Sequence, residues 1–390
     1  RGQSVVRHQR RLLCLYCSSS GFGRGRMEAE SPSSYRYMGR SYSDSGDSSG
    51  AFSDCNSDHS GEFPSSGSPT SSTSSSGGGL HRLLISCAAD YSDEVVRGLI
   101  SEIESPSVTV ESQRRAAMEL RLLAKHSSEN RLRIVAAGAV GPLVALLSHP
   151  DPHLQEHGVT AILNLSLCDE NKAPIAAAGA IRPLIRILRT GTPAARENAA
   201  CALLRLAQLD DLRAAIGRSG AIPPLVALLE FGGPRGKKDA ATALFTLLAS
   251  RENKARAVEA GIVRPLLDLM ADPESGMVDK AAYVLHAVVE VAEGRAAAVD
   301  EDGIPVLVEM VERGTPRQKE TAVRSLLEIC NDSAVYRKMV AHEGAIPPLV
   351  DLSQSGTKKA KEKVNLTSPT TTPPLTYIDL LFFPVIISFP

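Results

Sequence analysis

Apolar residues recur through the middle of this chain in one phrase, in which a glycine is followed by small or apolar residues, a proline, and then leucine and valine positions. The phrase reads GAIPPLVALL from Gly220, and a decayed copy begins at Gly303. Glycine ends a helix where φ must be positive, and proline opens the next helix in its first turn. Each copy therefore predicts the end of one helix and the start of another. The other copies begin at Gly138, Gly179, Gly261 and Gly344.

The copies are evenly spaced. The leucine after the proline position lies at residues 143, 184, 225, 266 and 307, each 41 residues after the last, and then at residue 349, which is 42 further on. A helical period near 40 residues is typical of armadillo and HEAT solenoids, in which each repeat packs only on its neighbours. We therefore predict an all-α fold, a right-handed armadillo-repeat superhelical solenoid of about six repeats.

Each complete repeat is expected to contain three helices. A short first helix opens on an acidic residue, any residue and a basic residue, as in Glu170-Asn171-Lys172, and the glycine-proline phrase supplies the second helix. A longer third helix carries an Ala/Leu pattern, in which small alanines let neighbouring helices approach and larger residues fill the space between repeats. The alanines are Ala199, Ala240, Ala281 and Ala322, and the larger residues are Ile162, Leu203, Leu244, Leu285 and Leu326.

Composition divides the chain into three parts. Residues 1–79 are rich in Ser and Gly, so we expect a disordered leader, in which the residues before Met27 or Met38 are interpreted as upstream translated sequence. Residues 80–363 are expected to form the armadillo domain, with an incomplete first repeat and a truncated last one. Residues 364–390 are expected to form an irregular tail, interpreted as non-native. Its apolar part, from Leu380, is too short to span a bilayer.

Net charge limits the kinds of partner that the chain attracts, and cysteine content indicates its compartment. The net charge of the 390 residues is −1, so no global field recruits nucleic acid or a membrane surface. The seven cysteines are scattered and show no disulfide framework, which suits a reducing compartment. We therefore expect a monomer that has protein partners and resides in the cytoplasm, with the nucleus as a second location.

Three patterns begin a small-ligand site without completing one. His153 and His157 lie one helical turn apart, but no third metal ligand is evident. The run from Gly232 to Lys238 is too short for a phosphate-binding loop, and no Ser or Thr follows its lysine. Cys14 and Cys17 form a CxxC without a second ligand pair. The sequence therefore predicts no metal, no cofactor and no catalytic group.

Several longer phrases resemble the armadillo region of plant U-box proteins, in particular the U-box domain-containing protein 4-like group. They are GVTAILNLSLCDENK at residues 158–172, RENAACALLRLAQLDD at residues 196–211, AIGRSGAIPPLVALLE at residues 215–230 and MVAHEGAIPPLV at residues 339–350. The resemblance covers residues 80–363. In the ligases of that family, the U-box docks a ubiquitin-conjugating enzyme and the repeats hold the substrate or a receptor kinase.

The resemblance implies a function without settling its class. No U-box-like stretch stands before the repeats in this sequence, so we expect a protein–protein interaction scaffold in ubiquitin-linked signalling rather than an enzyme. The alternative is the substrate-recognition region of a U-box E3 ubiquitin ligase whose U-box is absent from this sequence. A nuclear transport adaptor is disfavoured. The import receptors that this fold resembles carry arrays of Trp and Asn in the groove, and this chain has no Trp.

The 41-residue register also predicts where a partner binds. In an armadillo stack the third helices line the concave face, and positions four apart on a helix point the same way. Asn164 sets the register, because its amide can hold an extended peptide backbone. The predicted groove residues are Thr160, Asn164, Cys201, Arg205, Thr242, Thr246, Lys280, Tyr283, Arg324 and Glu328.

Two arginines give the predicted groove a preference for negatively charged side chains of a partner. Arg205 and Arg324 are suited to acidic or phosphorylated side chains, because a guanidinium group donates paired hydrogen bonds to such anions. The alternative is that both arginines form salt bridges with groove carboxylates such as Glu328. The sequence leaves these two interpretations open.

Overall fold

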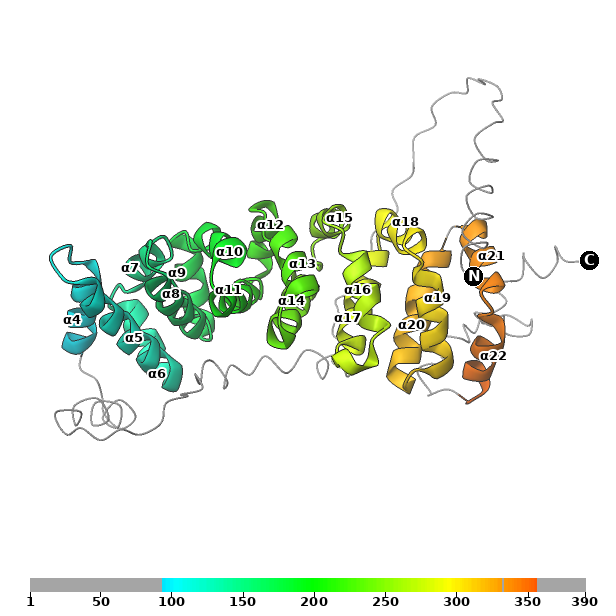
Figure 1. Ribbon diagram of the computed structural model, residues 1–390, viewed down its shortest axis with the longest axis horizontal. Helices are drawn as coiled ribbons and strands as arrows, with labels where there is room; N and C mark the ends of the chain where they lie inside the picture. The colour runs from blue at the N-terminus through cyan, green and yellow to red at the C-terminus, as the bar shows by residue number, and fades with distance from the viewer. Residues whose placement is uncertain (1–92, 332, 356–390) are drawn as a thin grey trace, which may run out of the picture. The chain divides into compact units, whose positions relative to one another are not determined.

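The computed structural model describes residues 93–331 and 333–355, and over them it contains 19 α-helices, one short 3₁₀ helix and no strand (Figure 1). The predictions made for the leader, for residues 364–390 and for the CxxC at Cys14 and Cys17 concern residues outside this part of the chain. Within residues 93–331 and 333–355, no single helix is long and apolar enough to cross a membrane. The pair α12 (Asp210–Arg218) and α13 (Ile222–Phe231) meets that test only together, across a bend of 84°.

The helices repeat in threes as the sequence predicts. The described part of the chain opens on α4 (Asp93–Glu104) and α5 (Val110–His126), the second and third helices of the first repeat that it shows. The first helices are α6 (Ser128–Ala136), α9 (Asp169–Ala177), α12 (Asp210–Arg218), α15 (Arg251–Glu259), α18 (Ala292–Asp300) and α21 (Ala334–His342). The second helices are α7 (Val140–Leu146), α10 (Ile181–Thr190), α13 (Ile222–Phe231), α16 (Val263–Met270), α19 (Gly303–Arg313) and α22 (Ile346–Ser355). The third helices after α5 are α8 (Pro152–Leu165), α11 (Pro193–Leu206), α14 (Pro234–Leu247), α17 (Val278–Val289) and α20 (Pro316–Cys330), and the 3₁₀ helix η2 (Pro273–Ser275) precedes α17.

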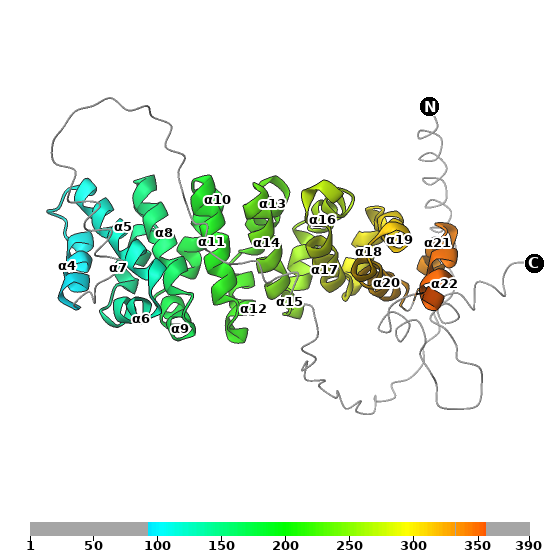
Figure 2. The ribbon, with the colours of Figure 1, turned by 90° about the horizontal axis from the view of Figure 1, so that it is seen from below.

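Neighbouring repeats stack through like helices. Each third helix contacts the next in the order α5, α8, α11, α14, α17 and α20, and the first helices α12, α15 and α18 contact one another in the same way. Figures 1 and 2 show the same order from two directions, with the helices following one another along the stack as they do along the chain. The contacts therefore join adjacent repeats, as a solenoid requires.

The glycine of each phrase takes the backbone conformation that the sequence predicts, with one exception. Gly138, Gly179, Gly220, Gly261 and Gly344 have φ between 74° and 89°. In the decayed copy the left-handed residue is Asp302, with φ 62°, and Gly303 is the first residue of α19. The predicted position is thus one residue late at that copy. Gly303 serves close packing instead, because a Cβ there would lie 2.6 Å from the carbonyl oxygen of Ala298.

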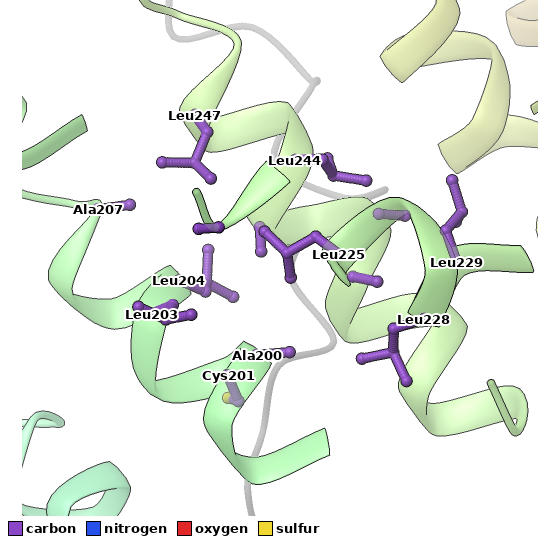
Figure 3. Packing of buried hydrophobic residues seen from close by; sticks show 14 of the residues in the cluster. Ala200, Cys201, Leu203, Leu204, Ala207, Leu225, Leu228, Leu229, Leu244 and Leu247 are labelled. Atoms are coloured by element: carbon purple, nitrogen blue, oxygen red, sulfur yellow. The ribbon is translucent and has the colours of Figure 1, made fainter. Parts of the chain in front are cut away.

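The core lies where the alanine and leucine positions predict it. Figure 3 shows the apolar side chains of α11, α13 and α14 gathered between those helices. All nine predicted core side chains are at most 1% exposed: Ala199, Ala240, Ala281, Ala322, Ile162, Leu203, Leu244, Leu285 and Leu326. The register of the third helices is therefore confirmed.

In four of the six first helices an arginine caps the third helix that precedes it. Arg131 Nε donates to the carbonyl oxygen of Ala124 at 2.7 Å, and Arg213 Nε donates to that of Ala207 at 2.9 Å. Arg295 and Arg337 reach the carbonyls of Val289 and Cys330 at 3.4 and 3.0 Å. The last carbonyls of a helix lack partners within the helix, and a cation there also complements the negative end of the helix dipole.

Two repeats carry lysine at this position, and there the asparagine before the lysine caps the preceding third helix. Asn171 Nδ2 donates to the carbonyl of Leu165, at the end of α8, and to that of Arg131 on α6, at 3.0 and 3.1 Å. Asn253 Nδ2 likewise bonds the carbonyls of Leu247 and Arg213, both at 2.9 Å. Lys172 and Lys254 are then available to reach the far end of their own repeat, where they bond the side chains of Gln208 and Glu290.

One of these asparagines depends on a glycine in the preceding repeat. Asn253 is fully buried, and a Cβ added to Gly217 would lie 1.8 Å from its Oδ1 atom. The missing side chain at residue 217 therefore makes room for the amide that joins α12, α14 and α15.

Leu203→Ala is expected to lower the free energy of unfolding by about 2–5 kcal/mol, because it removes a buried side chain between repeats and leaves a cavity. Chemical denaturation measures the change. Leu132→Ala, at a position 41% exposed on α6, is the matched control and should cost much less. A loss below about 0.5 kcal/mol for Leu203→Ala would contradict the register.

Gly217→Ala is expected to lower the free energy of unfolding by about 1–3 kcal/mol through overpacking. Helix propensity alone predicts the opposite sign, since alanine is favoured over glycine by about 0.5–1 kcal/mol inside a helix. Urea denaturation of Gly217→Ala and of the unaltered protein gives the sign of the change in the free energy of unfolding. In an Asn253→Ala background the same substitution should be neutral or stabilising, because the obstructing amide is gone. Stabilisation in the unaltered background would mean that Asn253 moves aside.

Candidate protein-binding surface

The ten predicted groove residues all lie on third helices, from α8 to α20, and each of these helices contacts the next. The structure divides them by exposure. The side chains of Thr160, Asn164, Cys201, Thr242 and Lys280 are buried, at 1–7% exposed. Those of Arg205, Thr246, Tyr283, Arg324 and Glu328 are half-buried and partly reach solvent. The half-buried five are the members of the set that a partner can touch without a rearrangement.

Two of the buried members, Asn164 and Thr160, join one repeat to the next. Asn164 Nδ2 donates to the carbonyl of Arg121 on α5 at 3.1 Å. Thr160 Oγ1 donates to the carbonyl of Glu156 at 2.7 Å and accepts a bond from Asn198 Nδ2 of α11 at 2.8 Å. The amide and hydroxyl chosen for peptide binding thus already have partners within the stack, and their role toward a partner protein stays a prediction.

Most of a row of polar residues three positions before Thr160 and its equivalents was missed by the sequence reasoning, which predicted only Lys280 of this row as a groove residue. Asn198 Oδ1 accepts a bond from Arg235 Nη2 at 2.9 Å, and Arg235 Nε lies 3.5 Å from Asp239 Oδ2. Glu197 Oε1 accepts from the backbone N–H of Gly236 at 3.1 Å. The same 41-residue register could have found the row, because its polar members vary in type at one position: His157, Asn198, Asp239, Lys280 and Thr321.

Tyr283 is held in place by an arginine of the next repeat. Arg317 Nε donates to its hydroxyl at 2.9 Å, and the guanidinium carbon lies 5.7 Å from the centre of its ring. A cation in this position is attracted to the face of the ring. Arg235 and Arg317 therefore both serve contacts between repeats.

Charge is distributed unevenly along the half-buried residues. The hydrogen bond from Lys172 lowers the pKa of Asp169 and the charge of Arg205 adds to this, whereas burial raises the pKa of Asp239 and the charge of Arg205 opposes it. The Arg205 guanidinium therefore lies near two carboxylates. Burial and the neighbouring Glu290 raise the pKa of Glu328, and Arg324 opposes them. Within residues 93–331 and 333–355, Arg324 and Glu328 form no ion pair, so the salt bridge considered between these two residues is not part of this structure.

The structure also shows where the sequence patterns considered as small-ligand sites lie. Over the described residues, no group of three or more His, Cys, Asp and Glu side chains is arranged to hold a metal ion. Cys201 and Cys330 are buried thiols, and burial raises the pKa of Cys330 to about 12. The Gly232–Lys238 run forms the break before α14 and its first turn, where Gly236 packs against Glu197. This placement agrees with the interpretation of the run as a connection between helices.

Comparisons with known proteins agree on the family. The family model of the plant U-box protein ARM repeat region matches residues 92–366. U-box domain-containing protein 14 of Arabidopsis thaliana is 63% identical over 59 residues, 15% of this chain and 9% of the relative. The E3 ubiquitin-protein ligase SPL11 of Oryza sativa subsp. japonica is 51% identical over 72 residues, 18% of this chain and 10% of the relative. The matched segments span about a tenth of the length of these curated relatives.

Solved structures agree on the fold. An engineered protein superposes with a TM-score of 0.61 at 28% identity, over 68% of this chain and 66% of that one. A computationally designed armadillo repeat protein for modular peptide recognition superposes with a TM-score of 0.55 at 23% identity, over 60% of this chain and 99% of that one. The predicted armadillo-repeat fold is confirmed.

The titration of Asp239 gives a pH dependence whose sign can be tested. Burial raises the pKa of this carboxyl from 3.8 to about 6, with Glu197 acting in the same direction and Arg235, Lys280 and Arg205 against it. The folded protein therefore binds this proton more tightly than the unfolded chain does. The resulting stabilisation is present below the unfolded pKa and is lost as the pH rises through about 6.

Asp239→Asn should therefore gain stability relative to the unaltered protein between about pH 4 and pH 7.5, by about 2–3 kcal/mol at about 1.4 kcal/mol per pKa unit. Urea denaturation at both pH values measures the relative change. Asp210→Asn is the control, because the Asp210 side chain is 82% exposed. A relative change that is the same for both variants would show that Asp239 is charged in the folded state at all these pH values.

Proposed function

The chain belongs to the plant U-box protein ARM repeat region family, and we propose from this that its repeats are a protein-binding scaffold that holds an extended segment of a partner along the third helices α8 to α20. One observation carries the proposal. Arg205, Thr246, Tyr283, Arg324 and Glu328 are polar and partly reach solvent, yet they lie on four consecutive third helices that are otherwise packed with apolar residues. Armadillo repeats are typical of protein-binding scaffolds.

The partner segment is acidic or phosphorylated. Arg205 and Arg324 provide two guanidinium groups along this row, and charge-assisted hydrogen bonds from such groups to carboxylates and phosphates are about twice as strong as neutral ones. A related use of the fold supports an extended ligand, because a designed armadillo repeat protein is described in complex with the peptide (KR)4. That peptide is basic, whereas Arg205 and Arg324 along the row of this chain would repel a basic segment.

The pathway proposed is ubiquitin-linked signalling in the cytoplasm or the nucleus. Its support is the naming of the relatives, among them an E3 ubiquitin-protein ligase and several U-box domain-containing proteins. The second candidate is the substrate-recognition part of such a ligase, with a substrate or a receptor kinase as the partner. A ubiquitination assay with purified activating and conjugating enzymes, run on this chain alone and on its fusion to a U-box, separates the two, because only the substrate-recognition part makes the fusion ubiquitinate the bound partner.

Neutralising both arginines, as Arg205→Gln with Arg324→Gln, is expected to weaken partner binding by about 2–5 kcal/mol, since each loses a charge-assisted hydrogen bond worth about 1.5–3 kcal/mol. The partner is first identified by affinity purification and mass spectrometry. Calorimetric titration then compares the variants, and circular dichroism should show unchanged helix content.

The matched control neutralises two exposed arginines of a second helix, Arg182→Gln with Arg189→Gln on α10. This pair changes the net charge by the same amount and lies outside the row of third helices. Equal weakening of partner binding by both double variants would show that only the net charge of the protein matters. No weakening by the Arg205 and Arg324 variant would move the binding surface away from the third helices.

A further inference from the structure

One residue of the first described third helix breaks the register that all later ones keep. Arg121 on α5 stands 41 residues before Ile162, at the position where each of the later third helices carries a buried aliphatic side chain. Those residues are Ile162, Leu203, Leu244, Leu285 and Leu326, and all are at most 1% exposed. Stacking of repeats does not require a cation there, since five other third helices do without one. The arginine calls for a reason of its own.

The partner of this guanidinium is a histidine rather than a carboxylate. Arg121 Nη1 lies 3.3 Å from His157 Nδ1 on α8. A guanidinium can only donate, so Nδ1 accepts and the imidazole is neutral, with its hydrogen on Nε2. Within residues 93–331 and 333–355, Arg121 forms no ion pair, and burial lowers its pKa with only the charge of Glu156 opposing. Glu156 Oε2 already accepts a bond from Thr192 Oγ1 at 3.2 Å.

A half-buried cation without a bonded counter-ion is costly, because it loses hydration without gaining an ionic partner. The groups around it add donors and little negative charge. His153 lies one helical turn before His157 and therefore on the same side of α8. Asp151 is the other acid whose charge acts on the pKa of His157. Its carboxylate already forms an ion pair with Arg114 of α5 and accepts a hydrogen bond from the backbone N–H of Leu154. Arg121, His157 and His153 thus form a cluster of N–H donors at the junction of α5 and α8.

We propose that Arg121, His157 and His153 bind a phosphoryl group carried on a side chain of a partner protein. Three donor groups suit the three terminal oxygens of a phosphate ester better than the two oxygens of a carboxylate. The planar guanidinium can direct two N–H groups at one anion, and the imidazoles add one donor each. The site extends the proposed function toward the N-terminal end of the row of third helices. It does not depend on that function, because small phosphate esters test it without any partner protein.

The test uses the whole chain, with its histidines isotopically labelled and the resonance of His157 assigned by its loss in His157→Asn. Phenyl phosphate, inorganic phosphate and acetate are titrated separately at constant ionic strength. We expect a saturable shift of the His157 resonance with phenyl phosphate, and at least tenfold weaker binding of acetate. A wild-type protein that shows no saturable shift overturns the proposal. So does acetate binding as tight as that of the ester, or binding of inorganic phosphate without the ester, because a side-chain phosphate is then not the ligand.

Two variants separate binding from stability. Arg121→Leu installs the residue type of the later repeats, so it should weaken phenyl phosphate binding at least tenfold while its thermal midpoint stays the same or rises. His157→Asn, which copies Asn198 of the next repeat, should weaken binding similarly when followed by calorimetry. Arg115→Leu, at an exposed arginine of the same helix, should leave binding unchanged. Undiminished affinity in both site variants, or equal loss in Arg115→Leu, overturns the proposal. A lower midpoint in Arg121→Leu would assign the arginine to the fold, and His157→Asn then decides whether the anion binds.

Discussion

The open carbonyls at the C-terminal end of each third helix are the constraint on which the stacking depends. Third helices pack on both sides, so their ends cannot all be left to water, and an unpaired buried carbonyl costs about 1–3 kcal/mol. The first helix of the next repeat supplies the donors, from arginine in four repeats and from asparagine in two. Capping a helix and joining two repeats are therefore one set of hydrogen bonds.

The sequence predicts the helices and the core well because both repeat. A 41-residue spacing places Leu203 and Leu244 at the same point of successive helices, and one buried position implies the others. The register does not report what the next repeat lays over a side chain. Thr160 was expected at an open groove, yet Asn198 reaches back from α11 to bond it. A periodic pattern gives the direction of a residue within its own helix, whereas its exposure depends on side chains from the neighbouring repeat.

The departures from the pattern are the more informative positions for function. A requirement of the fold recurs in every repeat, as the buried alanines of the third helices do. A residue that appears once, such as Asp239 or Arg121, answers to something other than stacking. The sequence contained this information in the variation at one register position, and only the structure shows that Asp239 is buried beside Arg235 while Arg121 faces His157.

From α6 to α18 the two ways of capping alternate, and this gives that part of the stack a longer period than its sequence shows. Asn171 and Asn253 are 82 residues apart, as are Gln208 and Glu290, which receive Lys172 and Lys254. In the intervening repeat Arg213 caps α11, and Ala249 stands where Gln208 and Glu290 do. Each lysine and its acceptor lie in one repeat, between its first helix and the end of its third, so duplication or deletion of a single repeat carries the pair along. Loss of the one repeat from α12 to α14 would instead change the neighbour of Asn253, because Ala176 stands 41 residues before Gly217, whose missing Cβ makes room for this amide.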